Sequence, residues 1–175
     1  MKPVRHKPAR VTLTKKECDK LATLLQIYKV VPYIGEQPER MLLWASDLES
    51  GKYRQRTNAL RGERNMRCCL GVACDTAAKE VGGKWKGYSF HIGDKYAHDA
   101  TFPDQVAAWY GLTLGDPLLL SGNGGRSATE LNDDLRLSFR SIAWIIRESV
   151  RLGKRVKHHG FLAEERNPND GGFIW

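Results

Sequence analysis

Apolar residues recur at every third or fourth position in four separate stretches of this 175-residue chain, and a glycine or proline stands at the end of each stretch. This spacing places the apolar side chains on one face of an α-helix, and that face has to be buried against other elements. We therefore expect helices over residues 14–31, 38–51, 67–81 and 138–153, with a short fifth helix over 103–109. Thr14 and Glu17 form a capping box for the first helix. Pro38 suits the first turn of the second, where the amide that proline lacks has no helical partner.

The rest of the chain predicts little regular structure. Tyr88, Phe90 and Ile92 alternate with other residues, which favours a β-hairpin that turns near Gly93 and Asp94. The glycine-rich segment 121–127 (SGNGGRS) is expected to be the most flexible internal segment. The length fits one folding unit. The predicted fold class is α+β, mainly α, as a single compact domain of about five helices with a small β-hairpin.

The expected organisation has three parts. Residues 1–12 are rich in proline, lysine and arginine with almost nothing to bury, which predicts a flexible basic arm. Residues 13–160 form the single globular domain, and residues 161–175 form a C-terminal tail whose last three apolar residues fold back onto the body. No apolar run reaches the roughly 18 residues that a membrane span needs. No secretion signal is recognised either, so the four cysteines are expected to be reduced, in a cytoplasm.

Positive charge is concentrated in three segments. Residues 1–16, 52–67 and 151–157 hold 16 of the 28 Lys and Arg residues but only one of the 20 Asp and Glu residues. The remainder of the chain is net acidic, although the whole carries a formal charge of +8. Segregation of this kind creates a field that attracts polyanions, and nucleic acid is the first of these to consider.

The segment 52–67 has the most specific composition. Arginine binds phosphate through two parallel N–H groups, and a tyrosine ring can stack on a base. The N-terminal arm and the run at 151–157 could converge with it on one polyanion. An acidic partner protein, or a surface that serves only to keep the chain in solution, fits the same composition. The candidate residues for binding nucleic acid or a partner are Lys52, Tyr53, Arg54, Arg56, Arg61, Arg64, Arg67, Arg151, Lys154, Arg155 and Lys157.

Two groups of residues raise the question of catalysis. Cys68 and Cys69 stand at a predicted helix N-terminus beside arginines, where a thiolate is stabilised, and His91 or His98 could act as a base. With Cys74 they more often pack a core, and their spacing does not match a zinc site.

Asp133 and Asp134, with Glu130, could hold a divalent cation or act in acid–base chemistry, but such residues also serve turns and caps. Segment 121–127 could cradle a phosphate, although a flexible connection is the simpler interpretation. The balance leans against an enzyme, and no metal or other cofactor is expected.

Three stretches together resemble a known family. MRCCLGVACDTAAKE (66–80) resembles the CCLGVxCD helix of small accessory proteins found mainly in tailed bacteriophages. PDQVAAWYGL (103–112) and LNDDLRLSFRSIAWIIRE (131–148) are similar to that family's P-x-x-V-x-x-W-x-GL and LND-x-x-x-x-SF-x-x-IA patterns. Order and spacing match over residues 42–150. The family's function is not settled, so the resemblance implies only an accessory protein encoded by a phage and acting in a bacterial cytoplasm.

The leading functional hypothesis is therefore a non-enzymatic phage accessory protein. Its basic face would bind nucleic acid or an acidic host protein, in host takeover or counter-defence. A sponge for a nucleotide signal is a second hypothesis, with phosphates held by segment 121–127 and the N-terminus of the helix at 67–81. A cysteine- or metal-dependent enzyme is a third hypothesis, and a minor virion component is a fourth. No membrane partner is expected, and the sequence leaves the oligomeric state open.

Overall fold

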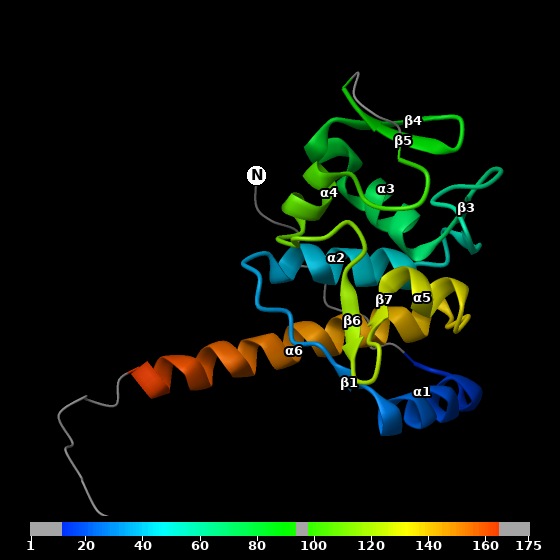
Figure 1. The fold of residues 1–175 in the computed structure, drawn as a ribbon. Helices are drawn as coiled ribbons and strands as arrows, with labels where there is room; N and C mark the ends of the chain where they lie inside the picture. The colour runs from blue at the N-terminus through cyan, green and yellow to red at the C-terminus, as the bar shows by residue number, and fades with distance from the viewer. Residues whose placement is uncertain (1–11, 94–97, 165–175) are drawn as a thin grey trace, which may run out of the picture.

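The computed structural model describes residues 12–93 and 98–164, with side chains as far as Lys157 (Figure 1). Helices and strands follow one another along the chain without a break into separate units. In chain order they are α1 (Lys15–Ile27), β1 (Lys29–Val30), α2 (Pro38–Glu49), β2 (Arg54–Gln55), β3 (Met66–Arg67), α3 (Cys69–Val81), β4 (Gly83–Lys86), β5 (Ser89–Ile92), α4 (Asp104–Trp109), β6 (Leu118–Ser121), β7 (Arg126–Ser127), α5 (Ala128–Asp133) and α6 (Phe139–Glu164). The predicted class, α+β and mainly α, is confirmed.

The core lies where α2 packs against α6 on one side and α3 on the other. Trp44 of α2 is fully buried at its centre, and its indole N–H donates to the carbonyl of Cys69 at 2.9 Å. The rings of Phe102 and Tyr110 each lie 5.7 Å from the Trp44 ring. Aromatic contacts of this kind stabilise a core beyond the area they bury. The Tyr110 hydroxyl donates to the carbonyl of Ala73, so α3 is tied to the segment after α4 as well.

Helix ends follow the expected local chemistry. The Thr14–Glu17 capping box of α1 is formed, and α2 begins with Pro38. Helix α3 ends at Gly82, which has a left-handed φ of 66°. Ser138 caps α6 by accepting a hydrogen bond from the amide of Ser141 at 3.2 Å.

Several features differ from the sequence-based prediction. The first helix ends at Ile27, not near residue 31, and Lys29–Val30 form strand β1. The hairpin of β4 and β5 turns at residues 87–88, not near Gly93, because Trp85 pairs with Phe90. Residues 122–125 form the turn between β6 and β7, and these strands make a three-stranded sheet with β1 in the order β1-β6-β7. The additional helix α5 is capped by Ser127, whose hydroxyl forms a second capping box with Glu130.

The last helix does not end at Gly153. That glycine is buried inside α6, and a Cβ atom placed on it would lie 1.7 Å from the carbonyl oxygen of Tyr33. Glycine inside a helix costs about 1 kcal/mol relative to alanine, and here it allows close packing of two backbones. The proposed domain boundary at residue 160 therefore falls inside α6. Residues 1–11 of the predicted arm and residues 165–175 of the predicted tail lie outside the described residues. Within the described chain, no helix combines the length and the apolarity that crossing a membrane requires.

Candidate nucleic-acid interface

The basic segment 52–67, called the basic loop from here on, contains the two short parallel strands β2 and β3 near its ends. Arg54 pairs with Met66 and Gln55 with Arg67 in the β2–β3 register. The amide of Arg56 donates to the carbonyl of Arg67 at 2.8 Å. Asn58 and Arg64 have left-handed φ values of 63° and 51°, which let the chain reverse direction twice. These contacts place both ends of the loop beside the N-terminus of α3.

Helix α5 anchors the first half of the basic loop. An oxygen of the Asp133 carboxylate accepts a hydrogen bond from the amide of Asn58 at 2.9 Å. The side-chain amide of buried Asn132 donates to the carbonyl of Arg56 at 2.8 Å and accepts from Gln55 at 3.0 Å. Asp133, a candidate catalytic or metal-binding carboxylate on sequence grounds, therefore holds the loop in place. Glu130 caps α5 and pairs with Arg126, so the three acids do not form a shared site. The described residues contain no cluster of three or more metal-ligating side chains.

Leu60, in the middle of the loop, is fully buried in the core. Its carbonyl accepts a hydrogen bond from the amide of Cys68 at 3.2 Å. A Cβ atom on Gly71 would lie only 1.8 Å from the same carbonyl oxygen. The glycine of the CCLGV sequence is thus required for the basic loop to approach α3 this closely.

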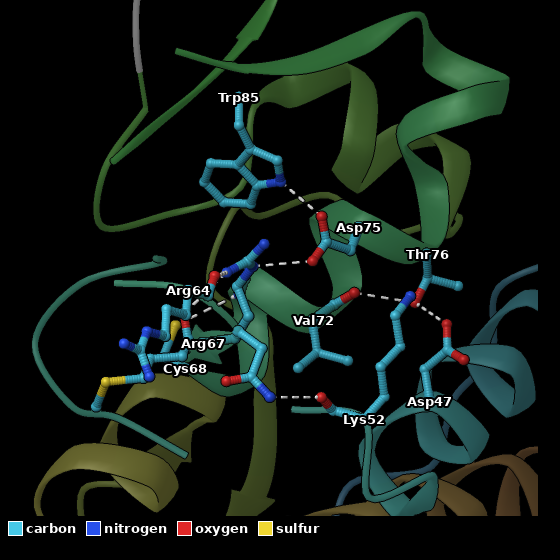
Figure 2. Close-up of polar contacts among 12 residues, drawn as sticks. Asp47, Lys52, Arg64, Arg67, Cys68, Val72, Asp75, Thr76 and Trp85 are labelled. Carbon is cyan, nitrogen blue, oxygen red and sulfur yellow. Dashed lines mark hydrogen bonds and ion pairs between the residues drawn. The ribbon is translucent and has the colours of Figure 1, made fainter. Parts of the chain in front are cut away.

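Arg67, the last residue of the loop, points into the protein. It is only 7% exposed, and its Nε donates to the Asp75 carboxylate at 2.8 Å (Figure 2). The other carboxylate oxygen of Asp75 accepts from the indole N–H of Trp85 at 2.5 Å. Arg67 also donates to the carbonyl of Met66 at 3.0 Å. Arg67, a candidate binding residue on sequence grounds, is therefore committed to an internal ion pair in the structure. Neither Asp75 nor Trp85 was predicted from the sequence as part of this site.

Several cations in and near the basic loop lie over aromatic rings. The guanidinium of Arg61 lies 5.4 Å from the centre of the Trp85 ring, and that of Arg67 lies 4.9 Å from the same ring. Arg67 is also 5.8 Å from the centre of the Tyr53 ring, over which the Lys52 ammonium lies at 4.9 Å. Interaction with the Tyr53 side chain raises the pKa of Lys52 above its usual value. The Tyr53 ring, a candidate for stacking on a base, is half-buried and makes these internal contacts in the structure.

Four cations of the basic loop face outward. Lys52, Arg54 and Arg64 are exposed, and Arg61 is partly exposed above Trp85. Arg56 instead turns inward along the loop, where it donates to the carbonyl of Arg61 at 2.8 Å. Among the described side chains, the ion pairs involve Arg67, Arg126, Arg147 and Arg151, so none of the four outward cations forms an ion pair with an acid there.

The second described basic run lies elsewhere. Residues 151–157 belong to the C-terminal part of α6, which extends away from the other elements, with the β3 region on the opposite side of the molecule (Figure 1). Arg151 is paired with Glu148, and Lys157 donates to the carbonyl of Gly35 at 3.0 Å. Lys154 and Arg155 are exposed. The structure therefore does not bring this run together with the basic loop.

The cysteines are placed for packing. Cys68, Cys69 and Cys74 are at most 3% exposed. The Cys69 thiol, together with the Gly71 amide, holds the pKa of Cys68 below its usual value against the opposing effect of burial. Burial raises the pKa values of Cys69 and Cys74 well above the usual value. Cys68 caps α3 by accepting from the Gly71 amide, so the arrangement serves the helix start and leaves the thiols out of reach of a substrate.

Comparison with known proteins places this geometry in a family context. No curated protein and no solved structure matches the chain. A family model described as a domain of unknown function, DUF8296, matches residues 38–150, from the start of α2 to the middle of α6. The match includes the whole basic loop together with its anchors in α3 and α5, and it ends just before the run at 151–157. The chain therefore belongs to the DUF8296 family.

Proposed function

We propose that this protein binds nucleic acid through the outward cations of the basic loop. The observation that carries the proposal is the set of four outward cations, Lys52, Arg54, Arg61 and Arg64, none of which pairs with an acid among the described residues. Asp75, the acid that lies beneath this surface, is engaged by Arg67 and Trp85. Positive charges left without counter-charges on one surface attract a phosphate backbone.

The anchoring of the loop supports this function. Binding is weakened when a flexible segment has to be ordered, and a loop that is already held in place avoids that cost. Leu60, Asn132 and Asp133 hold the backbone of the loop, while Trp85 supports Arg61 from below. The charges are thus presented at fixed positions before a ligand arrives.

The same contacts indicate how nucleic acid is bound. Because the Tyr53 and Trp85 rings interact with the protein's own cations, the surface offers charges and few groups that read bases. Contacts to phosphates fix position and carry little sequence information. The proposed binding is therefore of low sequence specificity and strongly dependent on salt. We place it in a phage accessory protein that acts without catalysis on nucleic acid in a bacterial host, in host takeover or counter-defence.

The test is a pair of charge-reversal variants with the same net charge. Arg54→Glu with Arg64→Glu removes two outward cations of the loop, and Lys154→Glu with Arg155→Glu removes two exposed cations of α6. Binding of a fluorescent 20-base-pair duplex is measured by anisotropy between about 50 and 200 mM salt. Loss of two phosphate contacts should lower the log–log salt slope by about 1.8 in the loop variant. The α6 variant should keep the original slope.

An equal loss of duplex affinity in both variants would show that net charge alone drives binding. That result would contradict the proposal. Failure of the unaltered protein to bind any duplex or single strand, together with salt-resistant capture of one acidic host protein, would assign the loop to protein docking instead.

A further inference from the structure

The hairpin of β4 and β5 carries a second group of cations, on the face turned away from the core. Lys84 and His91 are cross-strand partners in the antiparallel register, and Lys86 lies two residues further along β4. Because side chains alternate along a strand, these three share one face. Trp85 and Phe90 occupy the other face, with their rings 4.9 Å apart. The packing of Trp85 and Phe90 therefore determines that the two lysines and the histidine point outward.

This outer face is concave. Lys84, Lys86, His91, Gly82 and Gly93 line a pocket of about 230 Å³, called the hairpin pocket below. Both glycines have left-handed φ values, and a Cβ atom on either would meet no atom within 4 Å. The two ends of the pocket therefore carry no side chain, and no described atom lies close to them. Its volume corresponds to about eight water molecules at roughly 30 Å³ each, which is enough for a phosphate group and part of an attached sugar.

The two lysines of the hairpin pocket have no acidic partner in the part of the chain that the structure describes. Among residues 12–93 and 98–157, neither Lys84 nor Lys86 forms an ion pair. Like charges on one face of a two-stranded sheet destabilise it, and an anion between them would remove that repulsion. Two ammonium groups and an imidazole N–H together provide several donors for the oxygens of one phosphate group.

In the structure, the two places where the sequence suggested a phosphate have other roles. Residues 122–125 form the turn between β6 and β7, with Gly125 buried. The N-terminus of α3 is buried from Cys68 to Gly71, and its first amides are engaged by Leu60 and Cys68 contacts. The hairpin pocket, in contrast, opens to solvent and contains no residue of the basic loop.

We propose that the hairpin pocket is a site for the phosphate group of a mononucleotide, held by Lys84, Lys86 and His91. Tyr88, in the turn that joins the two strands, is 56% exposed, so the same hairpin offers an aromatic ring for the base. This inference does not rest on the proposed nucleic-acid interface, since the two surfaces share no residue.

The experiment is isothermal titration of the whole chain with AMP and, separately, with inorganic phosphate, at constant ionic strength. Lys84→Gln with Lys86→Gln removes both ammonium groups, and Lys79→Gln with Lys154→Gln makes the same change in net charge at exposed positions outside the pocket. We expect the pocket variant to bind AMP at least tenfold more weakly than the unaltered protein. The control variant should remain within about twofold, and inorganic phosphate should bind more weakly than AMP because it lacks the base.

Three results would overturn the inference. One is an absence of saturable AMP binding by the unaltered protein. Another is an equal loss of affinity in the pocket and control variants, which would indicate nonspecific attraction. The third is a pocket variant that loses duplex affinity while AMP never binds, which would make the lysines part of a nucleic-acid surface. The Arg54→Glu, Arg64→Glu variant should keep its AMP affinity, so failure of one proposal is distinguishable from failure of the other.

Discussion

Replacing Asp75 by alanine should destabilise the protein much more than breaking an ion pair at its surface. The Arg67 side chain is 8% exposed and that of Asp75 is 17% exposed, so the pair is nearly withdrawn from water. Removing one partner of a buried pair costs about 3–5 kcal/mol, because a buried charge is left without compensation. The Trp85 indole N–H would lose its acceptor as well. The Trp85 and Tyr53 rings would still contact the guanidinium, and such contacts contribute about 0.5–2 kcal/mol.

Together these effects predict a loss of about 3 kcal/mol in the free energy of unfolding for Asp75→Ala. At about 2–4 °C per kcal/mol for a chain of this size, the melting temperature should fall by about 6–12 °C. Urea denaturation followed by tryptophan fluorescence measures the change. The matched control is Arg151→Ala, which breaks the exposed Arg151–Glu148 pair and should cost less than about 1 kcal/mol.

A second variant separates the buried charge from lost packing. Arg67→Met combined with Asp75→Ala removes the unpaired cation, so the double variant should be more stable than Asp75→Ala alone. A loss below about 1 kcal/mol in Asp75→Ala, or a double variant less stable than this single one, would refute the reasoning about a buried charge.

Three further predictions concern the anchors of the basic loop and the buried thiols. Gly71→Ala should cost about 3 kcal/mol, because the new methyl group meets the Leu60 carbonyl oxygen at 1.8 Å and backbone has to move; thermal unfolding measures this, and a variant as stable as the parent would contradict the contact. Asp133→Ala should lose about 1–2 kcal/mol and speed amide hydrogen exchange at Asn58, whereas Asp134→Ala, at an exposed position, should do neither; equal effects would deny Asp133 its anchoring role. A thiol reagent should modify exposed Cys18 rapidly in the native protein and Cys68, Cys69 and Cys74 only after unfolding; fast modification of a second native thiol would show that this cluster is accessible.

Local sequence signals predicted the helices well because each signal acts within a few residues. Pro38, Gly51 and Gly82 mark helix ends through their own backbone preferences, whatever surrounds them. At Gly153 the local signal was misleading, because this glycine lies inside α6 and does not end it. Its role depends on the Tyr33 backbone, which lies far away in the sequence, and a local pattern contains no information about that contact.

The candidate site was predicted in part for the same reason. Composition located the basic loop, since charge density is a local property. It did not distinguish Arg64, which is exposed, from Arg67, which is buried, because the difference arises from Asp75 and Trp85 on other elements. The parallel pairing of β2 with β3 was also missed, since strands of two residues carry no periodicity. Asp133 looked like a turn, cap or catalytic residue, whereas its contact with Asn58, like that of Asn132 with Arg56, joins residues more than 70 positions apart.

The most direct test of the central claim is the salt dependence of duplex binding by the unaltered protein and the two charge-reversal variants. If the outward cations of the basic loop bind the phosphate backbone, Arg54→Glu with Arg64→Glu should lower the log–log slope by about 1.8. Lys154→Glu with Arg155→Glu should leave it unchanged. Equal slopes in all three proteins, or a loss confined to the α6 variant, would contradict the account.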